Sequence, residues 1–193
     1  MKQRLYGKEA KESRGIKKST CKFANSEKNQ TTSLPMKYRI LTNEELSHLE
    51  EDFKQFLIVS GIHAEEWEEI NKTDSSKAIQ LVEIFSDTVL QKVYEKIKFV
   101  EFRSENSCIV FSCQEDTIEL IAIQAKKGIH VNLSTPESIH AELKTRLENL
   151  QFQRSEKKYN VTRELEVHSL LEQGCVISSK DFWELLLKLI VAN

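Results

Sequence analysis

The residues best suited to nucleophilic or metal chemistry are the cysteines, and Cys108 and Cys113 share one short apolar segment. Thiolates serve as nucleophiles and zinc ligands, but redox and chelating pairs are typically spaced C-x-x-C. Five residues apart on one strand, these two side chains point to opposite faces of a sheet. We therefore expect both to be buried and inert, because a free cysteine packs as a small hydrophobe.

Histidine and glycine patterns offer no further chemistry. The five histidines form neither H-x-x-x-H nor H-E-x-x-H, and the five glycines form neither G-x-x-x-x-G-K-[ST] nor G-x-G-x-x-G. The histidines are His48, His63, His130, His140 and His168. The sequence therefore predicts no catalytic residue, no metal site and no cofactor, and each histidine is expected at the surface.

Four carboxylates surround Trp67 in the segment AEEWEEI, residues 64–70. Paired carboxylates transfer protons when their surroundings drive their pKa values apart. On a short exposed helix they only repel one another, so the pattern predicts a solvated face with Trp67 turned inward. An acidic docking patch for a basic partner is the alternative. The candidate partner-binding residues are Glu65, Glu66, Trp67 and Glu69.

The last segment, FWELLLKLIVA, has only a narrow polar strip formed by Glu184 and Lys188. A helix that is apolar on nearly every side is either buried in the core or in contact with another chain. Phe182, Trp183 and Leu186 are therefore candidate contacts for a protein partner or a homodimer.

Local signals place the helices that precede the predicted strands. Thr42 and Glu45 have the spacing of a capping box, and Gly61 suits the left-handed residue after a helix. A helix is expected over about 43–59, a short acidic helix over 64–70, and a long helix over 75–97. The long helix has an apolar stripe spaced three and four residues apart: Ala78, Leu81, Val82, Phe85, Val89, Val93 and Ile97.

The apolar period then changes from 3.6 to about 2, which predicts an antiparallel meander. Its strands are expected over 99–103, 108–113 and 117–125, with a fourth strand over 129–133 at an edge of the sheet. Thr135 and Pro136 begin a helix, and 153–160 is expected to be a polar linker. Helices over about 162–173 and after Ser179 complete an α+β fold in which N-terminal helices pack on a sheet of three or four strands.

Charge divides the chain at about residue 35. Residues 1–35 hold nine Lys or Arg and three Glu, whereas the others hold 19 basic and 27 acidic residues. The first segment lacks apolar periodicity and is expected to be a disordered basic tail. No stretch approaches the roughly 20 apolar residues of a membrane helix. We expect a cytoplasmic protein with no membrane contact, and nucleic-acid contact only through residues 1–35.

Two runs, MKYRILTNEELSHLEEDFKQFLIVSGIHAEEW and KAIQLVEIFSDTVLQKVYEKIKFVEFRS, resemble an uncharacterised family of Bacteroidota proteins that opens with MKYRxLTxEEL. This family is a numbered domain of unknown function. LLEQGCVIS followed by DFWELLLKL is similar to its ending, so the resemblance covers about residues 36–193. It implies a start at Met36, with 1–35 as an overextended start, and it transfers no catalytic residue. Where the family has GIDADDW, this chain has GIHAEEW, and His63 is a poorer helix cap than Asp.

The sequence favours one α+β domain over 36–193 that acts as a non-enzymatic protein-interaction module. Two alternatives remain. A small enzyme could assemble its site from residues distant in sequence. A nucleic-acid accessory protein could act through its basic N-terminal arm.

Overall fold

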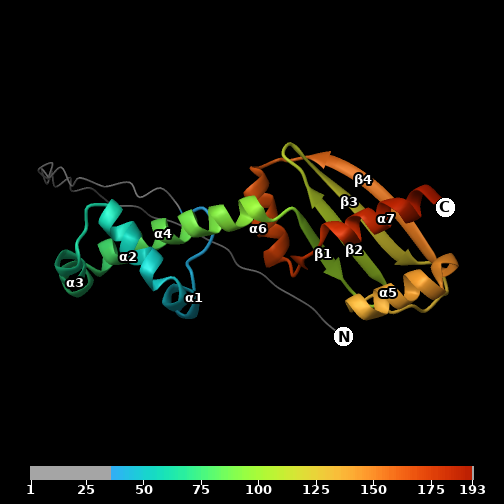
Figure 1. The fold of residues 1–193 in the computed structure, drawn as a ribbon, viewed down its shortest axis with the longest axis horizontal. Helices are drawn as coiled ribbons and strands as arrows, with labels where there is room; N and C mark the ends of the chain where they lie inside the picture. Colours follow the sequence, from blue (N-terminus) through green and yellow to red (C-terminus); the bar gives the residue numbers. More distant parts are fainter. Residues whose placement is uncertain (1–35, 193) are drawn as a thin grey trace, which may run out of the picture. The chain divides into compact units, whose positions relative to one another are not determined.

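The computed structural model describes residues 36–192, which form seven α-helices and one antiparallel sheet (Figure 1). The predicted α+β class is confirmed, with helices before and after the strands. The predicted tail, residues 1–35, lies outside the described residues. The elements are α1 (Asn43–His48), α2 (Glu50–Val59), α3 (Ala64–Thr73), α4 (Ser75–Lys96), β1 (Phe99–Arg103), β2 (Ser107–Cys113), β3 (Thr117–Ala125), α5 (Pro136–Thr145), the 3-10 turn η1 (Leu147–Asn149), β4 (Leu150–Lys158), α6 (Arg163–Glu172), β5 (Val176–Ile177) and α7 (Lys180–Ala192).

The sheet has five strands in the order β4-β3-β2-β1-β5, and every neighbouring pair is antiparallel. The first three strands form the predicted meander, in which Val110 pairs with both Glu101 and Ile121. The short strand β5 returns late in the chain to pair with β1. Strands β4 and β5 therefore supply the two edges.

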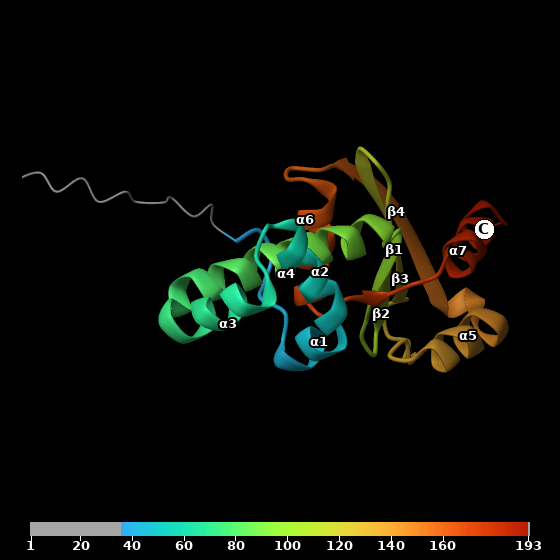
Figure 2. The same ribbon diagram turned by 60° about the vertical axis from the view of Figure 1, so that its left-hand side comes forward.

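Helices cover the two faces of the sheet in separate groups (Figure 2). Strand residues Cys108, Val110 and Ile121 pack with α5 and α7 in one core. On the opposite face, Val100 and Cys113 pack with α4 and α6 in a second core. The predicted opposite orientation of Cys108 and Cys113 is thus confirmed, and each thiol belongs to a different core.

The predicted helix over 43–59 is interrupted at Leu49, which separates α1 from α2. The expected capping box begins α1, since Thr42 Oγ1 accepts from Glu45 N and Glu45 Oε2 accepts from Thr42 N. At the break, Leu49 N donates to two carbonyls, of Glu45 and Leu46. Leu46 and Leu49 join the α4–α6 core, while Leu57 packs with α3. The apolar residues of α1 and α2 therefore contribute to two different cores.

The predicted strand over 129–133 is wrong. Leu133 is fully buried and Val131 packs beside it, as the alternation suggested, but the segment is a loop. The amide of Leu133 donates to Glu105 O in the turn between β1 and β2. Asn132 Oδ1 then accepts from Ser134 N, which closes a turn. Alternating burial was achieved by a loop with its own hydrogen bonds instead of by a strand.

The predicted linker over 153–160 is also wrong, because β4 occupies most of it. Leu150 and Phe152 face the α5–α7 core, and polar side chains follow them along the strand. Arg154 pairs with Glu119 of β3. Charged side chains are typical of an edge strand, where they oppose association with other strands. This composition made β4 resemble a linker.

Arg163, at the start of α6, joins three elements. Its guanidinium is buried and donates to Tyr94 O at 3.0 Å, to Cys113 O at 3.1 Å and to Ile97 O. These carbonyls lie at the end of α4, directly after it, and at the end of β2.

Among residues 36–192, no helix has the length and apolarity needed to cross a bilayer.

Candidate functional site

The first candidate site is a groove of about 340 Å³ between α2 and α3. Its floor is apolar and includes Phe53, Leu57, Ile62 and Trp67. Leu57 and Ile62 are buried, together with Ile70 and Ala78 of the helices behind them. The groove is therefore supported by a packed core of its own.

Backbone geometry at the α2–α3 turn fixes the groove. Gly61 adopts a φ of 78°, which a glycine accepts without strain. The amide of Ile62 donates a hydrogen bond to Leu57 O at 2.9 Å. The Trp67 ring then meets Phe53 edge-on, with ring centroids 5.2 Å apart. His63 precedes α3 without a side-chain cap bond, as expected of a poor cap, yet α3 runs to Thr73.

The two helices that flank this floor are acidic, and Glu50 and Glu68 line the groove itself. The helices carry seven carboxylates and two lysines, and both lysines are paired: Lys54 with Glu50 and Glu51, and Lys72 with Glu68. The hydrogen bond from Lys54 lowers the pKa of Glu50. The rim formed by α2 and α3 therefore has five more carboxylates than lysines.

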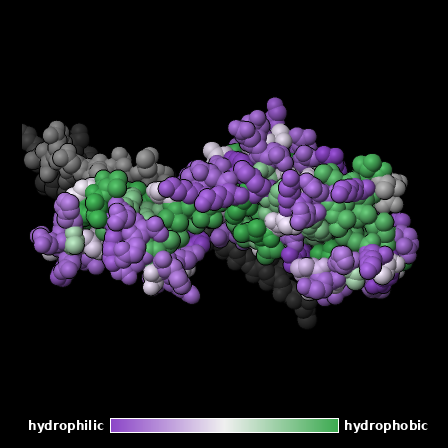
Figure 3. Space-filling view, viewed as in Figure 1, coloured by the Kyte–Doolittle hydropathy of each residue, from purple (hydrophilic) through white to green (hydrophobic). Residues whose placement is uncertain are grey.

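Exposed apolar side chains continue the groove onto the surface. Ile58 is 51% exposed and lines the groove, and Val59 beside it is 87% exposed. Figure 3 shows this hydrophobic patch at the end of α2 beside the hydrophilic surface of α3. A partner segment that covered it would need both apolar and basic groups.

The structure separates the seven residues proposed from the sequence. On α3, Trp67 lines the groove, while Glu65, Glu66 and Glu69 are exposed outside its lining. On α7, Phe182 lines a different pocket. Trp183 and Leu186 are buried against the sheet, so they are core residues and present no docking surface in this fold.

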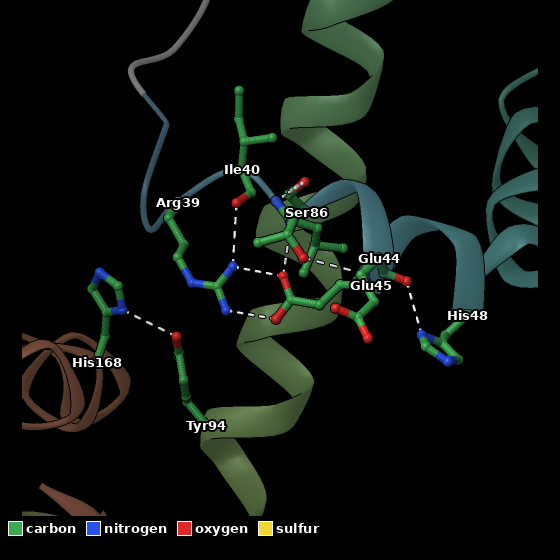
Figure 4. Close-up of polar contacts among 10 residues, drawn as sticks. Arg39, Ile40, Glu44, Glu45, His48, Ser86, Tyr94 and His168 are labelled. Atoms are coloured by element: carbon green, nitrogen blue, oxygen red, sulfur yellow. Dashed lines mark hydrogen bonds and ion pairs between the residues drawn. The ribbon is translucent and has the colours of Figure 1, made fainter. Parts of the chain in front are cut away.

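A second hollow, of about 470 Å³, lies among α1, α4 and α6, and its lining includes Arg39, Glu45 and Tyr94, whose polar contacts Figure 4 shows. Arg39 forms a bidentate pair with Glu45, with N–O distances of 2.7 and 2.8 Å. This pairing, with the amide of Thr42, lowers the pKa of the Glu45 carboxyl to about 2. Tyr94 Oη lies 3.0 Å from His168 Nδ1. Glu45 is thus a fixed anion that anchors α1, which makes it unsuitable as a general base near neutral pH.

The described cysteines are poor nucleophiles. Cys108, Cys113 and Cys175 are free and buried. Burial raises the pKa of Cys108 to about 12 and that of Cys113 to about 11, and it also raises the pKa of Cys175. These thiols are therefore protonated at neutral pH, whereas the reactive form of cysteine is the thiolate. Within residues 36–192, no three His, Cys, Asp or Glu side chains gather as a metal site would require.

The third hollow is a pocket of about 450 Å³ between α5 and α7, next to β1 and β5. Glu101 lies in it with only 4% of its surface exposed. One carboxylate oxygen of Glu101 accepts from Arg103, and the other accepts from Ser178 Oγ. His140 of α5 also lines this pocket.

Sequence reasoning missed this pocket and most of the groove. Glu101 and Arg103 alternate in FVEFR, which indicates only that they share a face of β1. Ser178 lies 77 residues beyond Glu101 and joins it through the return of β5. No local pattern signals that return. For the groove, the sequence predicted that Trp67 turns inward, but it did not predict the approach of α2 and α3.

Comparison with known protein families gives a match over most of the chain. The model of a family described as "Family of unknown function (DUF6495)" matches residues 36–191. No curated protein and no solved structure matches the chain.

Proposed function

The chain belongs to this family of unknown function, and we propose that it is a non-enzymatic interaction module that binds a basic, amphipathic segment of a partner protein in the α2–α3 groove. The observation that carries the proposal is an apolar floor between two helices that together carry seven carboxylates and two lysines. The proposal keeps Trp67 and the α3 carboxylates as contacts. It assigns no homodimer contact to Trp183 or Leu186, because both are buried where α7 packs against the sheet.

The chemistry of the groove suits an amphipathic helix. Such helices place their apolar face in a hydrophobic groove and anchor it at positions three and four residues apart. Phe53, Leu57 and Trp67 offer aromatic and aliphatic contacts, and Ile58 extends them to the surface. Aromatic residues are enriched among the contacts that dominate binding energy.

Charge complementarity selects a basic segment. The carboxylates of α2 and α3 outnumber their lysines by seven to two, and like-charged partners are repelled. Such a rim mainly accelerates association and discriminates between partners. Binding should therefore weaken as salt rises from about 0.1 to 0.5 M, where the screening length falls well below 10 Å.

Free cysteines support placement in the cytoplasm, because reducing compartments keep thiols unpaired. The enzyme alternative gains no support from the buried, protonated thiols. The nucleic-acid alternative depends on residues 1–35, which lie outside the described residues.

The test compares two isoleucines of similar exposure. Ile58→Arg places a cation and its bulk in the groove, whereas Ile84→Arg makes the same change on α4, where Ile84 is 49% exposed. Each full-length variant is used to purify partners from nuclease-treated host lysate, and bound protein is quantified by mass spectrometry. We expect the partner to be retained by the wild type and Ile84→Arg, and to fall at least about tenfold with Ile58→Arg.

A partner retained equally by all three proteins would contradict the groove assignment. Material that is captured only when the nuclease is omitted, and that is lost when residues 1–35 are removed, would favour the nucleic-acid alternative instead.

A further inference from the structure

The pocket between α5 and α7 has an apolar wall and one polar end. Ile139 and Leu143 of α5 face Phe182 and Leu185 of α7 across it. The polar end contains the Glu101–Arg103 pair with Ser178. Small-molecule sites combine these features: a mostly apolar cavity of about 300–1,000 Å³ with a few fixed polar groups.

The buried carboxylate of Glu101 is fully occupied by the protein. Its Oε1 accepts from Nε and Nη2 of Arg103, and its Oε2 accepts from the Ser178 hydroxyl. Its charge is neutralised by the guanidinium, so it neither requires a ligand donor nor leaves the pocket anionic. Glu101 instead holds Arg103 in one orientation.

That orientation leaves one edge of the guanidinium available. A guanidinium presents five N–H donors, and the Nε–Nη2 edge faces Glu101. Arg103 lines the pocket, and its contacts with described side chains run through Nε and Nη2, so none of them uses Nη1. A free guanidinium edge matches the two oxygens of a carboxylate with two parallel hydrogen bonds.

The start of α7 adds to the same preference. Ser179 Oγ accepts from Phe182 N at 3.1 Å and so caps the helix beside the polar end. The positive end of this 13-residue helix favours negative charge nearby. The polar end therefore offers donors and positive potential, while the remainder of the pocket offers hydrocarbon contacts.

We propose that the α5–α7 pocket binds a small amphipathic carboxylate, with its carboxylate on the free edge of Arg103 and its hydrocarbon portion between Ile139, Leu143, Phe182 and Leu185. This site is separate from the α2–α3 groove in both residues and chemistry. It adds a small-molecule ligand to the proposed protein partner and does not depend on that partner.

The test uses sodium octanoate as the probe and full-length protein, followed by two-dimensional amide NMR. We expect saturable shifts at Arg103, Ser178, Ser179 and Phe182. Along the series from butanoate to octanoate, affinity should rise about fourfold per methylene, as expected for buried hydrocarbon. 1-Octanol, which lacks the carboxylate, should bind at least about tenfold more weakly.

Two variants separate the head group from the hydrocarbon wall. Arg103→Lys retains a cation for Glu101 but loses the planar edge, so octanoate affinity should fall at least about tenfold. Leu185→Asp should abolish binding, while Val191→Asp, on the same helix but outside the pocket lining, should not change it. Dispersed amide spectra confirm that each variant is folded.

Absence of saturable shifts would overturn the proposal, as would shifts confined to another surface. Equal binding of octanol and octanoate, or full affinity in Arg103→Lys, would remove the assignment of the carboxylate to Arg103. If Arg103→Lys fails to fold, the Leu185→Asp and octanol comparisons decide the outcome.

Discussion

At the scale of single residues, Glu45 shows how one carboxylate can serve two structural roles. It completes the capping box with Thr42 and forms a bidentate pair with Arg39 (Figure 4). Both contacts require the ionised form, and they lower the pKa of Glu45 from 4.5 to about 2. Arg39, near the start of the described residues, is therefore held to α1 by a Glu45 carboxylate that stays ionised in mild acid.

The first prediction concerns this charge. Because the pKa of Glu45 is lower in the folded state, its contribution is complete above about pH 5 and is lost as the pH falls from 4.5 towards 2. Glu45→Gln should lower the free energy of unfolding by about 0.5–1 kcal/mol at pH 7, since the pair is more than one-third exposed. That difference should shrink towards zero near pH 2.

Urea unfolding at pH 7 and pH 3 measures the effect, with Glu44→Gln in the same helical turn as the control. An equal loss of stability at both pH values would show that Glu45 acts without its charge.

Individual residues were predictable where a local pattern constrained them. The Thr42–Glu45 box, the inward position of Trp67 and the opposed thiols all follow from spacing within one element. Ser178 meets Glu101 and Arg103 only because β5 returns to β1 after the 72 intervening residues 104–175, and no spacing rule reports that contact. The pocket was therefore beyond the reach of a single sequence.

At the scale of elements, several helix boundaries were predicted because caps and glycines are local signals, but the break at Leu49 and the end of α3 at Thr73 were not. Helix α6 ends before Gly174, which has a φ of 93°, and α5 begins at Pro136 after the Thr135 cap. Strand assignment failed where composition and pairing disagreed. Residues 129–133 had the alternation of a strand but found loop hydrogen bonds, whereas 150–158 had linker-like charge but paired with β3.

The second prediction tests whether α7 is an internal element. Leu186 is fully buried and Leu185, beside it, is 38% exposed. Leu186→Ala should lower the free energy of unfolding by about 2–5 kcal/mol through lost contacts and the cavity left behind. Leu185→Ala should cost less than about 1 kcal/mol.

Chemical denaturation at two protein concentrations measures both values. Similar costs for the two variants, or costs that depend on protein concentration, would indicate that α7 packs against another chain instead.

At the scale of the described molecule, residues 36–192, Arg163 connects parts that are far apart in sequence. It donates to carbonyls at the end of β2, at the end of α4 and just after α4, all from the first residue of α6. Each of these carbonyls is a group that a buried backbone must satisfy. One side chain thereby holds together the helical layer and the sheet.

The third prediction is that Arg163→Met lowers the free energy of unfolding by about 3 kcal/mol or more, because it leaves several buried acceptors without donors. Arg163→Lys should restore only part of the loss, since an ammonium cannot reproduce the planar donor geometry. Arg154→Met, which breaks the half-exposed pair with Glu119, should cost less than about 1 kcal/mol. Equal costs at the two arginines would show that Arg163 does not join these elements.

Each face of the sheet has buried thiols whose alkylation rate can be measured separately. Cys108 is sealed beneath α5 and α7, and Cys113 and Cys175 are sealed beneath α4 and α6. Each thiol reacts with an alkylating reagent only when its layer opens, so the labelling rate reports the free energy of that opening. Cys21, the fourth cysteine of the chain, lies outside the described residues and would be replaced by serine. Mass spectrometry of the alkylated peptides would then give a separate labelling rate for each layer. If one layer of helices opens more readily than the other, Cys108 will be alkylated at a different rate from Cys113 and Cys175 in the same sample.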